Sequence, residues 1–456
     1  MTTTDDSSLE PTGGPTADPS GEPAAMAVDP TPGVTIVDTS LALTDFSLDE
    51  QQNSLGDVWH NTVTRLRSGD LGSLPAILAI IVLVAIFGIS RPDSFLSLLN
   101  FANFLDQASS VIVIAMAVTF VLLLGDIDLA AGFTAGVSAA VLATRLADGW
   151  PLVPSLFASF GVALLLGVFT GFLVAKVGIP SFVVTLANVL LFQGILLLIV
   201  KDGGSVRIQN DFINDIVGGT LTPTQSWIIS VLGVALYAFS QIRRQRDSYG
   251  AIPVSLVAIR LGLAVVGVAL LTYLLNQNRA FESAPQPITG MPIVIPMIAI
   301  LTVLLTFVLN RLRYGRFLYA VGGNREAARR AGINVQRVEW SAFICTAFIA
   351  AIGGIFLASR VNSVDSNTGA NDTLLLAVGA AVIGGTSLFG GRGRMINAVL
   401  GGLVLALIPN GLGLIGKTTL FGYDIDFGSS GVKFICSGLA LLVAASVDAL
   451  SRKRTV

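Results

Sequence analysis

The stretch Ala108–Gly125 reads ASSVIVIAMAVTFVLLLG and contains no charged residue. Its length falls within the roughly 17–25 residues that an α-helix needs to cross the hydrocarbon core of a bilayer. A polar segment, Asp126–Asp128, follows directly, and a second apolar run begins at Leu129. Long apolar runs separated by short polar breaks predict an all-α polytopic membrane protein.

The same alternation continues in both directions from this stretch. The apolar runs cover residues 75–90, 108–125, 129–147, 151–175, 181–200, 226–241, 256–275, 292–310, 340–359, 374–391, 395–415 and 431–449. Several runs are near or below the minimum spanning length, so one or two of them can be broken or re-entrant. We therefore expect about 10–12 transmembrane helices.

Composition supports a membrane protein and excludes several kinds of site. The chain is 53% hydrophobic and 12% charged, whereas soluble domains carry roughly 25% charged residues. His60 in the N-terminal region is the only histidine of the chain, which argues against His-ligated metal sites and histidine-dependent catalysis in the apolar part. Cys345 and Cys436 lie inside apolar runs and are interpreted as small core residues. We expect no catalytic residue, metal, cofactor or nucleic-acid partner.

The N-terminal region differs sharply from the rest of the chain. Residues 1–72 are rich in Pro, Gly, Ser, Thr and Asp, and the first 64 residues contain eleven Asp and Glu but no Lys or Arg. Such a segment cannot bury enough apolar surface to offset its ordering entropy. We expect residues 1–72 to be a disordered acidic tail, either a regulatory docking segment or a solvated extension, with an amphipathic piece near 55–66. Residues 73–456 form the transmembrane domain.

Basic residues predict the orientation of the domain. With the N-terminus in the cytoplasm and a crossing at every run, the cytoplasmic side receives 18 Lys and Arg and the outer side receives 7. Because cytoplasmic loops of membrane proteins are enriched in Lys and Arg, both termini are expected in the cytoplasm. The bilayer would be the inner membrane of a bacterium.

Two glycine-rich patterns have simple interpretations. Gly132–Gly136 and Gly167–Gly171 are GxxxG patterns, which let helix backbones approach closely and indicate a compact bundle. Gly411–Thr418 matches the phosphate-binding pattern GxxxxGK[ST], but it follows an apolar run with Pro409, and only 38 residues remain after it. A nucleotide-binding domain needs a buried strand before this loop, so we expect no nucleotide site.

Polar residues at two places could line a transport path. Asp126 and Asp128 lie in a glycine-flanked break between two runs, and intramembrane carboxylates usually face a bundle interior or water. The break is either a structured element near the path or an interfacial turn in which Asp128 caps the next helix. Ser181, Thr185 and Asn188 share one helix face, and they fit a pathway for a polar solute and interhelical hydrogen bonding equally well.

A long basic loop, Arg311–Val338, separates two later runs. Within it, Gly323 or Asn324 can cap a short helix over 325–330, and Gly332 can end that helix. The loop is either a rigid knob for a partner or a solvated segment that sets the topology. A second glycine-rich turn, at 382–394, predicts a tight helix–turn–helix at the membrane face.

Four motifs together resemble the ribose/xylose-type permease family of ATP-binding-cassette importers. They occur in the family's order across roughly residues 75–450: GxIDLxxG at 125–132, PSFVVTLA at 180–187, YAVGGNREAARRAGINV at 319–335 and IGGTSLFGG at 383–391. The xylose-permease branch is the most similar. Leu374 and Leu376 stand where family members commonly carry Glu and Asp, so the particular sugar is left open.

The resemblance implies a function and a set of partners. The chain would be the permease domain that imports a monosaccharide, with a separate ATPase subunit, an extracytoplasmic sugar-binding protein and a second permease copy. The segment that docks on the ATPase would contain Gly323, Asn324, Glu326, Ala327, Ala328 and Gly332. The alternatives are a permease for another small solute, such as a nucleoside or a branched-chain amino acid, an ion-coupled secondary transporter, and an intramembrane enzyme.

Overall fold

The computed structural model describes residues 72–201, 204–247, 253–281, 286–420 and 423–453. The chain divides into two compact units, and the first, Met1–Gln51, lies entirely outside the described residues. The predicted acidic tail, apart from its last residue, and the predicted amphipathic piece near 55–66 also lie outside them.

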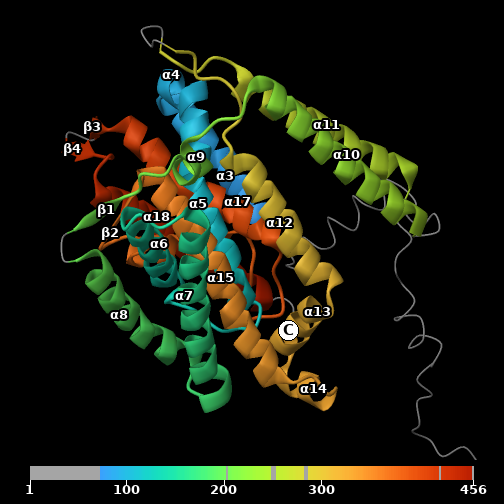
Figure 1. Cartoon of the computed structure of the whole chain (residues 1–456). Coiled ribbons are helices and arrows are strands. Elements are labelled where there is room, and N and C mark those ends of the chain that lie inside the picture. Colours follow the sequence, from blue (N-terminus) through green and yellow to red (C-terminus); the bar gives the residue numbers. More distant parts are fainter. Residues whose placement is uncertain (1–71, 202–203, 248–252, 282–285, 421–422, 454–456) are drawn as a thin grey trace, which may run out of the picture. The chain divides into compact units, whose positions relative to one another are not determined.

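Twelve described helices correspond one by one to the twelve predicted runs (Figure 1). They are α3 (Leu74–Ser90), α5 (Leu98–Leu122), α6 (Ala131–Ala147), α7 (Leu152–Phe172), α8 (Ser181–Val200), α10 (Pro223–Asp247), α11 (Val254–Asn276), α12 (Val294–Arg311), α15 (Val335–Val361), α16 (Asn371–Ile383), α17 (Met395–Ile415) and α18 (Ser430–Lys453). The shorter elements are α4 (Pro92–Phe95), η1 (Leu173–Val177), α9 (Asp211–Gly218), α13 (Arg313–Gly323), α14 (Arg325–Arg330) and strands β1 (Ser205–Arg207), β2 (Ser363–Asp365), β3 (Lys417–Leu420) and β4 (Tyr423–Asp426).

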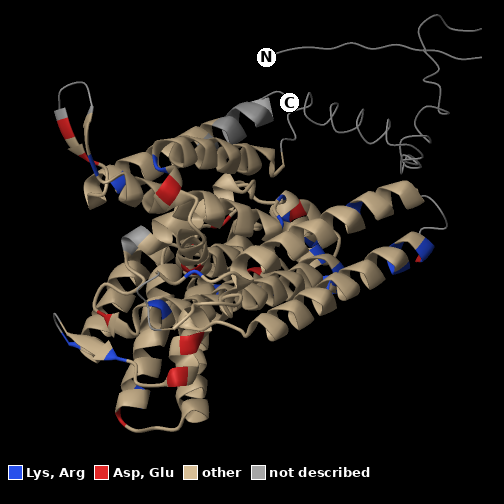
Figure 2. Cartoon of the chain, turned by 90° about the horizontal axis from the view of Figure 1, so that it is seen from above, with Lys and Arg blue, Asp and Glu red and all other residues tan. Residues whose placement is uncertain are grey.

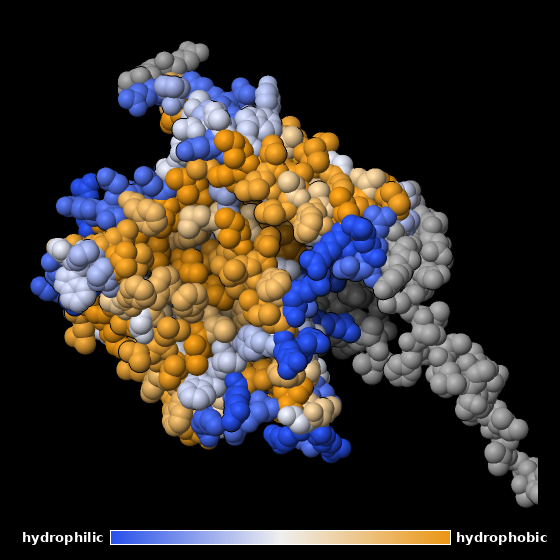
Figure 3. All heavy atoms as spheres, turned by 45° about the vertical axis from the view of Figure 1, so that its right-hand side comes forward, coloured by the Kyte–Doolittle hydropathy of each residue, from blue (hydrophilic) through white to orange (hydrophobic). Residues whose placement is uncertain are grey.

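Length and composition confirm an all-α polytopic membrane protein. Within the described residues, eight helices are long and apolar enough to cross a membrane, and four shorter apolar helices accompany them. Figure 3 shows a broad hydrophobic face with hydrophilic side chains gathered at its margins. Figure 2 shows helices that are mostly tan, with only scattered positions coloured for Lys, Arg, Asp or Glu. Such a surface is stable facing lipid and not water.

The core is built around α5 and α15, which pack against each other and against α6, α7 and α17. Nearly every residue of α5 from Ala108 to Leu122 is buried. A helix whose side chains are buried on every side lies inside the bundle, so α5 takes the central place. Phe120 and Phe343 are among the large side chains that fill the space between these helices.

Both GxxxG patterns mark close backbone packing, as the sequence predicted. A Cβ on Gly136 would lie 2.1 Å from the carbonyl oxygen of Thr368, and one on Gly167 would lie 2.6 Å from the Ala347 side chain. The second pattern joins α7 to α15, as helix-packing patterns do. The first pattern, on α6, packs against a non-helical segment of the chain and not against a helix.

That segment, residues 362–370, consists of β2 and the turns that lead from β2 to the start of α16; we call it the extended segment. Its carbonyl groups at Thr368 and Gly369 rest on Gly136 and Gly132 of α6. These glycines lie in the first two turns of α6, far from the end of α6 at Ala147. The helix that follows, α16, has only 13 residues, because the extended segment has already crossed part of the bundle.

Connections predicted on the same side of a membrane meet in the structure. At one end, β1 pairs with β2 in an antiparallel ladder and Thr220 bridges Pro292; we call this the β1 end. At the other, the Gly391 amide donates to the Leu123 carbonyl over 2.9 Å, beside α14; we call this the α14 end. Helices that run in alternating directions between these two ends account for both sets of contacts.

Helices α10 and α11 form a hairpin that makes few contacts with the rest of the bundle (Figure 1). The hairpin is held internally by a hydrogen bond of 2.6 Å between the hydroxyls of Ser230 and Thr272. Buried hydroxyl pairs of this kind are how helices associate in lipid, where no hydrophobic force acts between them.

Candidate functional site

The break between α5 and α6 is a structured turn at the α14 end. Helix α5 ends at Leu122, and Gly125 adopts φ +77°, a conformation that favours glycine. A Cβ at this position would also meet the Phe389 carbonyl oxygen at 3.0 Å. The turn therefore requires glycine for its backbone angle and for its contact with the 384–394 segment.

Asp126 in this turn belongs to an ion triad with Arg325 and Glu339, in which the two carboxylates are buried and the arginine is partly exposed. Arg325 donates through Nη2 to Asp126 Oδ2 over 2.8 Å, and its Nη1 lies 3.1 Å from Glu339 Oε1. The carboxylate side chains are 10% exposed and the guanidinium side chain 48% exposed. Two buried carboxylates next to each other require a shared cation, so Arg325 joins α14, the turn and α15.

The polar face of α8 is turned into the bundle. Ser181 Oγ donates to Asp126 Oδ1 over 2.9 Å, and Thr185 Oγ1 donates to the Ile127 carbonyl over 3.2 Å. Asn188 donates to Thr170 Oγ1 of α7 over 2.9 Å. The predicted shared face exists, and in this structure each of its three residues has a protein partner.

Asp128 lies in the same turn and is separate from the triad. Its Oδ1 accepts a hydrogen bond of 2.9 Å from the Ala130 amide, one residue before α6 begins. The side chain is almost fully buried, and burial raises the pKa of Asp128 to about 6, although the amides of Ala130 and Ala131 lower it in part. Asp128 therefore holds the backbone just before α6 through this hydrogen bond, from two residues before the N-cap of α6.

The basic loop folds as its sequence signals predict. Asn324 caps α14, accepting a hydrogen bond of 2.9 Å from the Ala327 amide, and α14 covers the predicted residues 325–330. Gly332 adopts φ +81° after the helix, as the αL residue beyond a helix C-terminus commonly does. The loop also contains α13, which the sequence analysis did not predict.

Helix α14 has an inner and an outer face. Ala328 is buried, whereas Glu326 and Ala327 are exposed, and Glu326 pairs with the exposed Arg329 and Arg330 on its own helix. Gly323, before the cap, is also exposed. The outer face is thus short, charged and available for contact with another molecule, and the inner face fixes the helix to the bundle.

The glycine-rich turn at 384–394 completes the α14 end. Gly390 and Gly391 adopt φ +84° and +74° and pack against Gly125 and Gly322. Tyr319 of α13 donates to the Gly393 carbonyl over 2.7 Å, and burial raises the pKa of the Tyr319 hydroxyl. All four sequence motifs therefore meet at this end of the bundle.

Sequence reasoning missed Arg325 and Glu339 as members of the site. Arg325 is one of several arginines in its loop, and no local pattern distinguishes it. The position of Glu339 could have indicated its role, because it is a carboxylate at the edge of the apolar run that begins at residue 340. Such a residue usually has a partner inside the bundle.

The phosphate-loop pattern has no nucleotide-binding structure around it. Gly411–Ile415 is the last part of α17, and Lys417 and Thr418 begin β3, which pairs with β4 in a small hairpin. In the described residues no group of three or more His, Cys, Asp and Glu side chains could hold a metal ion.

Comparisons with known proteins define the class. Residues 100–426, well over half of the chain, match the family described as the permease component of the branched-chain amino acid transport system. The chain belongs to this family, and it is a multi-pass membrane permease of ATP-binding-cassette transporters.

Among curated proteins, it is similar to the xylose transport system permease protein XylH of Escherichia coli (strain K12). The two are 32% identical over 397 residues, which cover 86% of this chain and 95% of the relative. The ribose import permease protein RbsC of Haemophilus influenzae is 27% identical over 371 residues, covering 81% and 91%. No solved structure matches this chain.

Proposed function

We propose that this chain is the membrane-spanning subunit of an importer for a monosaccharide, xylose or a similar sugar. A binding protein would deliver the sugar, and a separate ATPase would supply the energy, because the described residues form no nucleotide-binding domain. Similarity to xylose and ribose permeases over more than four fifths of the chain supports the substrate class. A second copy of the chain would complete the transmembrane part.

The observation that carries the mechanism is the position of α14. An importer permease must receive the closing motion of its ATPase through a rigid contact. Helix α14 presents an exposed outer face and is tied by Arg325 to the α5–α6 turn and to α15. Motion applied to α14 would therefore reach three helices of the core.

The predicted docking residues divide into two roles. Glu326 and Ala327 would contact the ATPase, since both are on the outer face. Asn324 and Gly332 would define the ends of the helix, Gly323 would leave room before the cap, and Ala328 would hold the inner face against the bundle. Because Ala328 is buried, a charge there would disturb folding as well as docking.

A test of docking should therefore change Ala327. In the complete importer, Ala327→Trp is expected to insert normally into the membrane, to lose co-purification with the ATPase and to lose sugar uptake. Ala147→Trp is the matched control, because Ala147 is also exposed and ends α6 at the opposite end of the bundle. If Ala327→Trp retains both ATPase co-purification and uptake, α14 is not the docking element.

The predicted path residues would act at the cytoplasmic gate. Asp126, Asp128, Ser181, Thr185 and Asn188 would hold the α5–α6 turn against α8 and α7, so that a movement of α14 changes the opening at that end. If these residues form the cytoplasmic gate, the α14 end and both termini would lie on the cytoplasmic side of a bacterial inner membrane. Single cysteines at 320–335 should then resist labelling from outside sealed cells, while cysteines at 205–220 should react.

A second substrate class has one observation in its favour. The description of the matching family names branched-chain amino acid transport, so a branched-chain amino acid is the alternative substrate. Cells carrying the complete importer should take up radiolabelled D-xylose through this chain and not L-leucine. If the cells take up L-leucine and not D-xylose, the substrate is an amino acid and the proposal of a sugar importer is wrong.

A further inference from the structure

A cavity of about 710 Å³ lies between α8 and α18, with α6, α16 and α17 behind it. Most of its lining is apolar, including Phe434 and Leu376. Three uncharged polar side chains also line it: Gln193 of α8, Asn367 of the extended segment, and Ser437 of α18. The cavity is thus formed by elements far apart in the chain.

The three polar side chains lack protein partners. In the described part of the chain, the side chains of Gln193, Asn367 and Ser437 make no hydrogen bond or ion pair, although the Asn367 backbone amide donates to Asp365, and Ser437 is only 9% exposed. Many other hydroxyls inside the bundle are paired; Ser138 and Ser159, for example, lie 2.8 Å apart, whereas Ser110 and Thr386 lack a partner among the described residues. Polar groups within a membrane are costly unless they meet a polar partner. The cavity therefore needs a partner that the protein does not supply.

The depth of the extended segment indicates water in the cavity. Thr368 rests on Gly136, which is about 8 Å along α6 from its first residue, whereas the whole helix is about 25 Å long. Irregular backbone at such depth is tolerated only where it is buried in protein or lines a water-filled space. Asn367, beside Thr368, is exposed and lines the cavity, so the second condition applies.

We propose that this cavity is a binding subsite on the translocation route for an uncharged, hydroxyl-rich ligand of monosaccharide size; the route itself rests on the proposed function. Amide and hydroxyl side chains both donate and accept hydrogen bonds, as sugar hydroxyls require. Phe434 and the leucines offer apolar surface to the carbon face of the ligand. Among the lining residues there is no Asp, Glu, Lys or Arg, so a zwitterionic amino acid would lack counter-charges.

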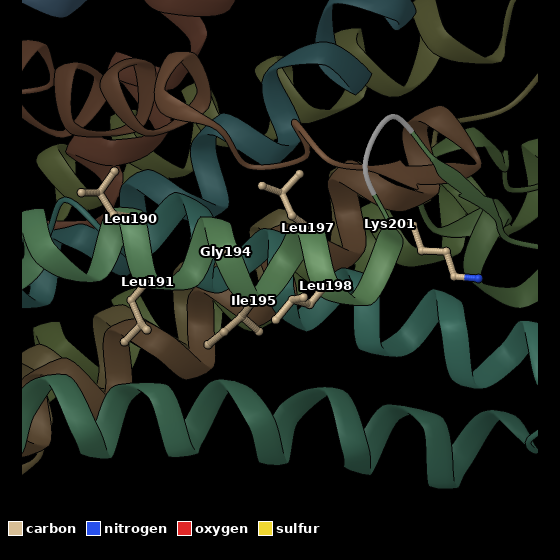
Figure 4. A pocket seen from close by; sticks show the side chains of 7 residues that line it. All are labelled: Leu190, Leu191, Gly194, Ile195, Leu197, Leu198 and Lys201. Carbon is tan, nitrogen blue, oxygen red and sulfur yellow. The ribbon is translucent and has the colours of Figure 1, made fainter.

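Another part of the α8 surface provides a contrast. A second hollow there is lined by leucines, Ile195 and Gly194, with Lys201 at its edge (Figure 4). Leu198 in this hollow is 85% exposed, and its lining offers no uncharged polar side chain. Such a surface suits lipid chains. The two hollows thus provide a site and a matched control on the same helix.

Filling each hollow with the same side chain tests the subsite. A Cβ on Gly438, which lines the cavity, or on Gly194, which lines the leucine hollow, would meet no atom within 4 Å. In the complete importer, Gly438→Phe should lower radiolabelled D-xylose uptake about tenfold or more, with ATPase co-purification retained. Gly194→Phe should stay within about twofold of the unmodified chain. Normal uptake by Gly438→Phe, or equal loss in both variants, would overturn the proposal.

Thiol labelling separates this proposal from the sugar assignment. In a chain with Cys345→Ser and Cys436→Ser, a membrane-impermeant charged thiol reagent should label Gln193→Cys and spare Leu198→Cys, although Leu198 is the more exposed position. This labelling pattern without any D-xylose uptake by the unmodified chain would support the hydrated cavity and reject the sugar. D-xylose uptake with no labelling at Gln193→Cys would keep the sugar importer and reject the cavity.

Discussion

Removing Arg325 should disrupt the α14 end far more than removing a neighbouring arginine. Arg325→Ala leaves Asp126 and Glu339 with side chains only 10% exposed and without their shared cation. Asp126 would retain only its contact with Ser181 among its side-chain partners. Breaking a buried pair by removing one partner is costly because the remaining charge stays uncompensated.

The magnitude follows from the two contacts, at 2.8 Å and 3.1 Å. Hydrogen bonds to charged groups contribute roughly 1.5–3 kcal/mol each. Because the Arg325 side chain is 48% exposed, solvent screening reduces the summed contribution of the two contacts to stability. We expect Arg325→Ala to cost roughly 2 kcal/mol. Arg325→Lys should cost about half of that, since one ammonium group reaches two separate carboxylates less well.

Arg329→Ala is the matched control on the same helix. Its pair with Glu326, at 3.4 Å, joins side chains that are both more than half exposed, and such pairs contribute roughly 0–1 kcal/mol. The assay is thermal unfolding of the detergent-purified chain, with uptake by the complete importer measured in parallel. Combining Arg325→Ala with Asp126→Asn and Glu339→Gln should recover most of the lost stability. Equal stability of Arg325→Ala and Arg329→Ala would refute the triad as a structural link.

Three further predictions concern other parts of the chain. Gly136→Ala should lower thermal stability by roughly 1–3 kcal/mol because its Cβ would meet the Thr368 carbonyl, whereas Gly161→Ala, with open space around it, should be neutral or slightly stabilising. The pKa of Asp128 is raised by burial to about 6 from 3.8, so the protonated form favours folding and this contribution is lost as pH rises through 6. Asp128→Asn should therefore be more stable than the unmodified chain at pH 7.5, by up to roughly 3 kcal/mol, and should melt at a higher temperature, and the difference should close toward pH 4; a difference independent of pH would contradict the buried carboxyl. The purified chain alone should hydrolyse no ATP, and turnover abolished by Lys417→Ala would show the opposite.

Local signals in the sequence were enough to find the helices. The length of an apolar run and the residues at its ends are local properties, so twelve predicted runs correspond to twelve helices, although most bounds moved by a few residues. Helix α14 was predicted with its bounds because a capping Asn324 and a terminating Gly332 are both short-range signals. Helix α13, which has neither a side-chain cap nor a long apolar run, was missed.

Only the tertiary structure decided which residues meet. Arg325 is about 200 residues from Asp126 in the chain, and nothing near either residue in the sequence indicates their contact. Ser181, Thr185 and Asn188 were correctly placed on one face, but a helical period does not say whether that face meets a neighbouring helix or a transport path. The sequence by itself determined the membrane class, the spans and the capped helix, because these depend on residues within a few turns of each other. The ion triad, the extended segment on Gly136 and the cavity between α8 and α18 depend on packing between distant helices, and packing geometry is encoded in no single stretch of the chain.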